Sequence, residues 1–177
     1  MTLKAWTLAA ALAALPLAAE AQMAQEAPPA ACPAADASLL PALAGWPHKA
    51  AVAGATSAAG LSNARLTVGE AARVSLHPTP EVAYPLQPEK PGGSVSHGGL
   101  VEFSVAAAGD YQVALSSGAW IDVVAKGQAV VSTAHGHGPA CSTIRKMVDF
   151  SLQPGRYVLQ ISANADPDLG LMIVRRP

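Results

Sequence analysis

Apolar and polar residues alternate along most of the second half of the chain. The alternation is clearest at 101–105 and 111–115, and similar segments follow at 120–124, 128–132, 143–152, 156–162 and 169–174. Alternation with a period of two predicts half-buried β-strands. Turn residues, such as Gly109-Asp110 and Pro154-Gly155, separate these segments at short intervals. Such spacing is typical of antiparallel sandwiches and barrels.

We therefore expect an all-β protein, a single antiparallel and jelly-roll-like β-sandwich over residues 65–177. Residues 22–64 form an Ala/Pro-rich tail in this interpretation. The tail includes one short helix over 36–46, which Asp36 would cap and in which Leu39, Leu40 and Leu43 recur at helical spacing.

The segment 77–99 is rich in proline, which cannot donate to a sheet ladder. It is not a central strand, and we expect it either to be functional or to cover a sheet edge.

The domain contains an internal repeat. The pattern of 101–111, a strand, a turn and then Gly-x-Tyr, recurs at 148–157. We expect two hairpins of one design within a two-sheet core.

The first residues have the features of a secretory signal. Lys4 precedes an apolar run over 5–17, and Ala19-Glu20-Ala21 is a small-x-small cleavage site. The run is shorter than the ~20 residues of a membrane-spanning helix. We expect a signal peptide over 1–21, a periplasmic or secreted protein, and no membrane span after cleavage.

The charge balance of the chain limits the classes of partner that it could bind, and its two cysteines predict a disulfide. The chain has 11 basic and 12 acidic side chains, which argues against a nucleic-acid partner. Cys32 and Cys141 would form a disulfide in an oxidising compartment. Closing so long a loop is worth about 4–5 kcal/mol at most. The alternative leaves Cys32 free and makes Cys141 a metal ligand.

One metal site is conceivable. His135 and His137 point the same way if the backbone is extended, and Cys141 and His97 could complete a zinc or copper site. The alternative is a glycine-rich turn with solvated histidines, no cofactor and Cys141 in the disulfide.

Two further places could bind a ligand. Lys146 falls on the apolar face of its predicted strand, which Ile144 and Val148 share, and Lys146 or the adjacent Arg145 could bind an anion. Alternatively, this is a strand end where the lysine reaches solvent. Trp120 and Asp122 share a strand face and could bind a sugar, or they could be structural.

No catalytic residue is assigned, because the chain has no nucleophile elbow, no His-Glu-x-x-His and no phosphate-binding loop. Segments 101–105, 108–113, 120–123 and 152–161 resemble the bacterial pre-peptidase C-terminal domain. That resemblance implies a secreted β-sandwich with a binding or maturation role and no catalysis. The sequence also looks like a group of short exported proteobacterial proteins, some labelled homogentisate dioxygenase, but it lacks the cupin spacing of such an iron enzyme.

The resulting hypothesis is an exported, non-catalytic binding or accessory protein whose partner is a small molecule, a glycan or a periplasmic protein. One alternative is a small metalloprotein that carries a metal or acts as an oxygenase-like enzyme. A second alternative is a carbohydrate-binding module that uses Trp120.

Overall fold

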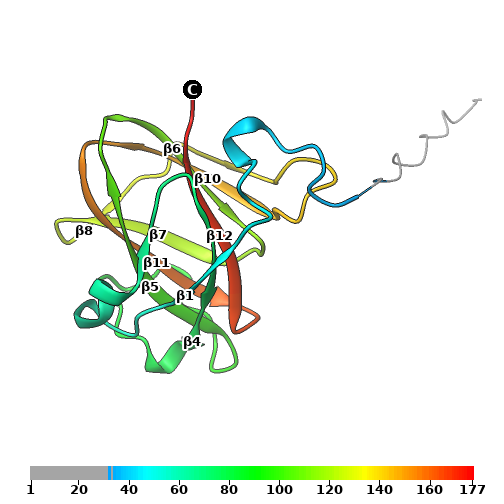
Figure 1. The fold of residues 1–177 in the computed structure, drawn as a ribbon. Coiled ribbons are helices and arrows are strands. Elements are labelled where there is room, and N and C mark those ends of the chain that lie inside the picture. Colours follow the sequence, from blue (N-terminus) through cyan, green and yellow to red (C-terminus); the bar gives the residue numbers. More distant parts are fainter. Residues whose placement is uncertain (1–31, 33) are drawn as a thin grey trace, which may run out of the picture. The chain divides into compact units, whose positions relative to one another are not determined.

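Two β-sheets pack face to face (Figure 1). The structure, a computed structural model, describes residue 32 and residues 34–177, so the signal peptide expected over 1–21 lies outside the described residues. The first sheet has the order β1 (Ala50–Ala53), β3 (Ala71–Ser75), β12 (Asp168–Arg175), β6 (Gly109–Leu115), β10 (Lys146–Leu152), β9 (Ala134–Gly136). The second has the order β2 (Arg65–Leu66), β5 (His97–Val105), β11 (Gly155–Asn164), β7 (Trp120–Ala125), β8 (Gln128–Val130), and β4 (His77–Pro78) pairs with the start of β5.

The expected all-β sandwich is confirmed, with one correction to its strand directions. Most neighbouring strands are antiparallel, but β1 runs parallel to β3 and β2 runs parallel to β5. Between β1 and β3 the chain visits the other sheet as β2, and this crossover permits the parallel alignment.

The expectation of a short helix over 36–46 is wrong. Only the 3-10 turn η1 (Pro41–Leu43) forms there, without a side-chain cap. Residues 50–53 form β1 and Ala58–Asn63 form a second 3-10 turn, η2, so strands of the sheets begin before residue 65.

The main core lies between the two sheets and is lined by the alternating residues that the sequence identified, among them Phe103, Val113 and Leu159. A smaller second core lies beneath the segment that contains η1. It consists of Leu43, Trp46, Ala71, Ala114, Ile144, Met172 and Val174. Ile144 therefore does not share a face with Val148, because β10 begins only at Lys146 and the alternation does not extend into the preceding loop.

The internal repeat is real, but its two copies are not hairpins. Each copy crosses from one sheet to the other, β5 to β6 and β10 to β11, and the copies interleave because β5 pairs with β11 and β6 with β10. In each copy the tyrosine hydroxyl donates to a carbonyl four residues earlier. Tyr111 bonds Ala107 O at 2.8 Å and Tyr157 bonds Gln153 O at 2.7 Å. The repeated Gly-x-Tyr thus fixes the two crossings.

The proline-rich segment lies against the outer side of the second sheet and is tied to β11. Gln160 and Ser162 alternate along β11 with core residues, so their side chains face away from the core. The Gln160 amide bonds both backbone groups of Leu86 at 2.9 and 3.1 Å, and Ser162 Oγ donates to Lys90 O at 2.8 Å. Residues 89 and 90 therefore lie near Trp120, the first residue of β7.

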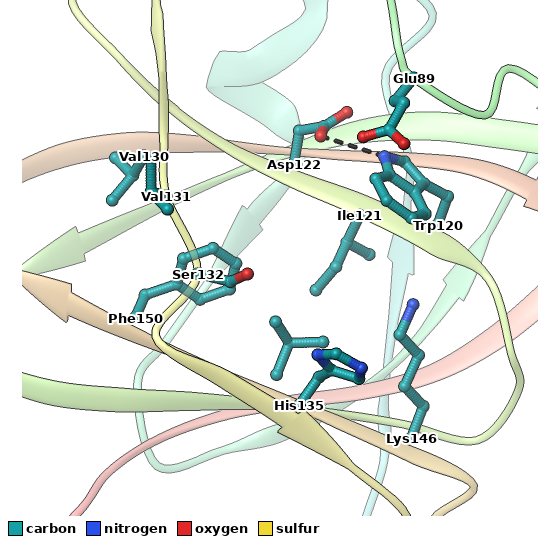
Figure 2. Close-up of a pocket in the computed structure, with 11 residues that line it drawn as sticks. Glu89, Trp120, Ile121, Asp122, Val130, Val131, Ser132, His135, Lys146 and Phe150 are labelled. Atoms are coloured by element: carbon teal, nitrogen blue, oxygen red, sulfur yellow. Dashed lines mark hydrogen bonds between the residues drawn. The ribbon is translucent and has the colours of Figure 1, made fainter.

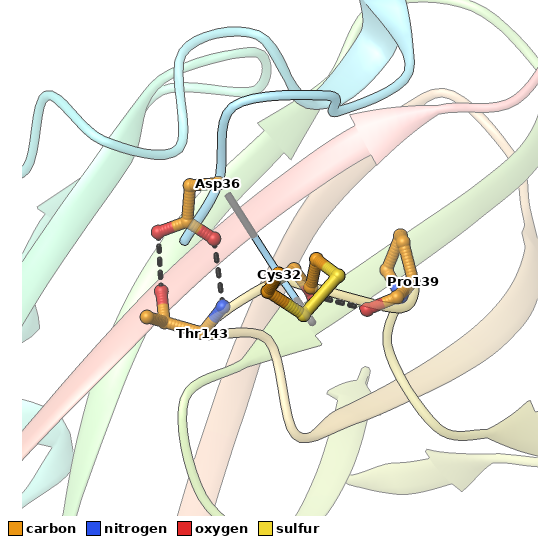
Figure 3. Close-up of a disulfide and its surroundings, with 6 residues drawn as sticks. Cys32, Asp36, Pro139 and Thr143 are labelled. Carbon is orange, nitrogen blue, oxygen red and sulfur yellow. Dashed lines mark hydrogen bonds between the residues drawn. A yellow bond between two sulfur atoms is a disulfide. The ribbon is translucent and has the colours of Figure 1, made fainter. Parts of the chain in front are cut away.

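The described N-terminal residues are clamped to the loop that precedes β10 (Figure 3). Cys32 and Cys141, 109 residues apart, form the expected disulfide. Asp36 accepts hydrogen bonds from Thr143 N at 2.7 Å and Thr143 Oγ1 at 2.6 Å. Trp46 Nε1 donates to the same hydroxyl at 2.8 Å. This clamp, made by the disulfide and the bonds of Asp36 to Thr143, is thereby connected to the second core through Trp46.

Candidate functional site

A pocket of about 360 Å³ lies where the two sheets open at one side of the sandwich (Figure 2). On that side β8 pairs only with Val123–Ala125, and the first half of β7 borders the pocket. The chain leaves β8 and crosses to the other sheet through Val131 and Ser132, which form one wall. The irregular crossing leaves room for side chains between β7 and β10.

The pocket has an apolar floor and a polar rim. The floor is made by Ile121, Val130, Val148 and Phe150, all of which belong to the main core or are packed against it. The polar lining comes from several separate elements and consists of Glu89, Trp120, Asp122, Ser132, His135 and Lys146. A concave apolar site with a few converging polar groups is typical of small-molecule binding.

Lys146 is the first residue of β10 and lies on the same strand face as Val148 and Phe150. Its ammonium donates to Ala119 O at 2.8 Å and lies 5.5 Å from the centre of the Trp120 ring. Burial lowers the pKa of Lys146, and the positive charge of Lys90 lowers it further, while Asp122 partly opposes both effects. The amine is thus held, partly desolvated, at the edge of an apolar floor.

Trp120 is held from several sides. Its Nε1 donates to Asp122 Oδ1 at 3.1 Å, as Figure 2 shows, and the ammonium of Lys90 lies 5.0 Å from its ring centre. The second carboxylate oxygen of Asp122 accepts from Gln160 Nε2 at 3.4 Å. These contacts fix the indole between two cations and one carboxylate.

The structure brings together three of the four residues considered for ligand binding. Trp120, Asp122 and Lys146 line one pocket, together with His135. Arg145 is exposed and lines a different groove, with His137 and Ile144. Neighbours along an extended chain alternate sides, and this separates Arg145 from Lys146.

The four residues considered for a metal site are not assembled. The sulfur of Cys141 is bonded to that of Cys32, and His135 and His137 line different pockets. His97 begins β5 in the other sheet, where Nδ1 is 3.2 Å from Ala165 O. Across residues 32 and 34–177, no three His, Cys, Asp or Glu side chains gather as metal ligands.

Sequence reasoning missed Glu89, which lines this pocket, and Lys90, whose ammonium lies 5.0 Å from the centre of the Trp120 ring. Both belong to the proline-rich segment 77–99, whose path depends on the hydrogen bonds that it makes with Gln160 and Ser162. The sequence carried one usable signal: glutamine and serine at 160 and 162 interrupt an otherwise apolar late strand. Polar residues at such positions indicate that something packs on that face of the sheet.

Comparisons with known proteins find similarity among solved structures. No protein-family model matches the chain, and no curated protein matches it either. Within residues 32 and 34–177, no helix has the length and hydrophobicity that a membrane crossing requires. Among solved structures, the chain is similar to the pre-peptidase C-terminal domain of a collagenase from Bacillus anthracis, with 16% identity over 71% of this chain and 95% of that chain and a TM-score of 0.38. This similar structure is of the same domain that the strand sequences resemble.

Proposed function

We propose that this chain is an exported, non-catalytic binding protein that takes a small organic molecule into the pocket between β7 and β10. The pocket itself carries the proposal. Its volume of about 360 Å³ lies within the range of small-molecule sites, about 300–1,000 Å³. Its floor is apolar, and few polar groups converge on it, which is the arrangement that orients a bound molecule.

Export is supported by the Cys32–Cys141 disulfide, because such bonds persist in extracellular and periplasmic compartments. The signal peptide expected over 1–21 supports the same location. Mass spectrometry of protein secreted from an expressing cell would test both, since the mature chain would begin at Gln22 and carry the disulfide.

A glycan is the less supported ligand. Sugar-binding modules use an aromatic face that is free to stack. Here two ammonium groups already lie over the Trp120 ring, and its N–H is bonded to Asp122. A stacked sugar would have to displace at least one lysine.

The binding proposal is tested with anilinonaphthalene sulfonate, a dye that fluoresces in apolar surroundings. We expect saturable binding of one dye per folded chain. Ser132→Trp places an indole on the exposed wall of the pocket and should weaken binding about tenfold or more, a loss of about 1.4 kcal/mol.

Ala129→Trp is the matched control, since Ala129 is exposed on β8 and does not line the pocket. It should bind the dye as the unmodified protein does, and both variants should keep the same melting temperature. Unsaturable dye binding, or equal binding by Ser132→Trp, would contradict the proposal.

A further inference from the structure

We propose that the ligand of this pocket is a small monocarboxylic acid, whose carboxylate binds Lys146 and whose apolar body lies on the floor. The inference rests on the proposed function, because it assigns the chemistry of the molecule that the pocket takes. Three features of the pocket carry it: the two lysines at one indole, the free donors of Lys146, and the arrangement of the acidic side chains.

Two like charges meet at the Trp120 ring. The ammonium groups of Lys90 and Lys146 lie 5.0 and 5.5 Å from its centre. The ion pairs found in the described part of the chain are made by Arg65, Arg156 and Arg176, and neither lysine takes part in one. Because the lysines repel each other, an anion that binds beside them gains attraction from both.

Lys146 has donors to spare. A lysine ammonium carries three N–H groups, and the contact with Ala119 O uses one of them. In Figure 2 the side chain of Lys146 extends from β10 toward Trp120, along the side of the pocket. A carboxylate at this position would accept charge-assisted hydrogen bonds, which are about twice as strong as neutral ones.

The acidic side chains indicate one carboxylate rather than two. Both oxygens of Asp122 accept neutral N–H donors, from Trp120 and Gln160, so this carboxylate is held in place without an ion pair. Glu89 is exposed at the rim and lies beside Trp120 and Asp122 in Figure 2. A second carboxylate on the ligand would approach one of these negative charges, whereas an uncharged end would not.

The space fits a ring or a short alkyl chain with an acid group. A closed apolar cavity of about 150 Å³ accommodates benzene, and this pocket has about 360 Å³. Val130, Val148 and Phe150 offer the apolar contact. Benzoate and benzamide are suitable probes, because they have nearly the same shape and differ in charge.

The test measures the affinity of the full-length mature protein for benzoate and for benzamide by titration calorimetry. We expect benzoate to bind about tenfold more tightly than benzamide. Lys146→Gln should abolish this preference, and Lys146→Arg should retain most of it because the charge remains. Lys126→Gln is the matched control, since Lys126 is exposed in the β7–β8 turn and does not line the pocket.

Equal affinity for the acid and the amide would overturn the inference, as would a preference that persists in Lys146→Gln. If the unmodified protein still binds the dye saturably in that case, the pocket remains a binding site and only its carboxylate specificity is wrong. If neither the dye nor benzoate binds the folded protein, the proposed function and this inference both fail.

Discussion

Lys146 and Phe150 lie on the same face of β10 and line the same pocket, although one is charged and the other belongs to the buried core. The lysine therefore occupies a position that an apolar side chain would fill in an ordinary sandwich. Burial disfavours its charged form, and this lowers its pKa. A charge kept at such a position is expected to serve binding rather than stability.

Replacing Lys146 by methionine tests that expectation. Methionine has a similar length and removes the desolvated charge, so Lys146→Met should leave the free energy of unfolding unchanged or raise it. Because the folded-state pKa is lowered, the unfolded chain binds the proton more tightly than the folded chain does. The free-energy cost of holding the charged Lys146 in the fold is therefore present at neutral pH, and it has disappeared once the pH passes the ordinary value of 10.5. The native protein should therefore gain stability relative to Lys146→Met between neutral pH and that value.

Urea denaturation at several pH values measures the difference, with Lys126→Met as an exposed control. If Lys146→Met lowers the free energy of unfolding by more than about 2 kcal/mol at neutral pH, the loss exceeds what one ordinary hydrogen bond contributes. Lys146 would then be a structural residue.

The disulfide should stabilise the domain more than any other single contact. Replacing Cys32 and Cys141 by serine opens a loop of 109 residues. We expect the free energy of unfolding to fall by up to about 4–5 kcal/mol. Urea midpoints of the double variant, compared with those of the native protein with and without reductant, test this. Equal midpoints would show that the bonds of Asp36 to Thr143 hold the clamp alone.

Tyr84 should make the proline-rich segment sensitive to alkali. Its hydroxyl donates to Ile161 O at 3.0 Å, and burial raises its pKa to about 12. A raised folded-state pKa means that stability is fully present below the ordinary value of 10.0 and is lost as the pH rises toward 12. Tyr84→Phe should lack this loss over that range while costing about 1 kcal/mol at neutral pH.

Urea midpoints of the native protein and of Tyr84→Phe, followed from neutral pH into that range, measure this. A parallel decline in both proteins would show that another group is responsible.

The two copies of the repeat predict that each tyrosine hydroxyl stabilises the fold, the second more than the first. Tyr111→Phe and Tyr157→Phe each remove one hydroxyl bond to a carbonyl, worth about 1 kcal/mol. Tyr157 should cost more, because its hydroxyl also accepts from Gln153 N at 3.1 Å. Denaturation of the single and double variants checks this, and a silent Tyr157→Phe would contradict it.

The strands and the disulfide could be predicted from sequence, because alternation and cysteine pairing follow from local rules. The same alternation placed Lys146 on the core face, where the structure has it. Asp36 was misassigned as a helix cap, because the sequence does not show that the disulfide would bring Thr143 within its reach.

The remainder of the site depends on tertiary contacts. Glu89 reaches the pocket and Lys90 reaches the Trp120 ring because Gln160 and Ser162 bind the backbone of a segment more than seventy positions away in sequence. The two histidines of the His-Gly-His turn line different pockets, because a short strand, β9, ends between them. Neither outcome follows from residue spacing.

The most direct test of the central claim is a two-dimensional ¹H–¹⁵N NMR titration of the mature protein with benzoate. The Trp120 indole resonance is the reporter, because Trp120 lines the pocket and its N–H donates to Asp122, which also lines it. We predict that this resonance and the amides of residues 119–122, 130–135 and 146–150 shift together and saturate. Benzamide should shift them less at equal concentration. An unmoved Trp120 resonance, or shifts centred on Arg145 and His137, would contradict the account.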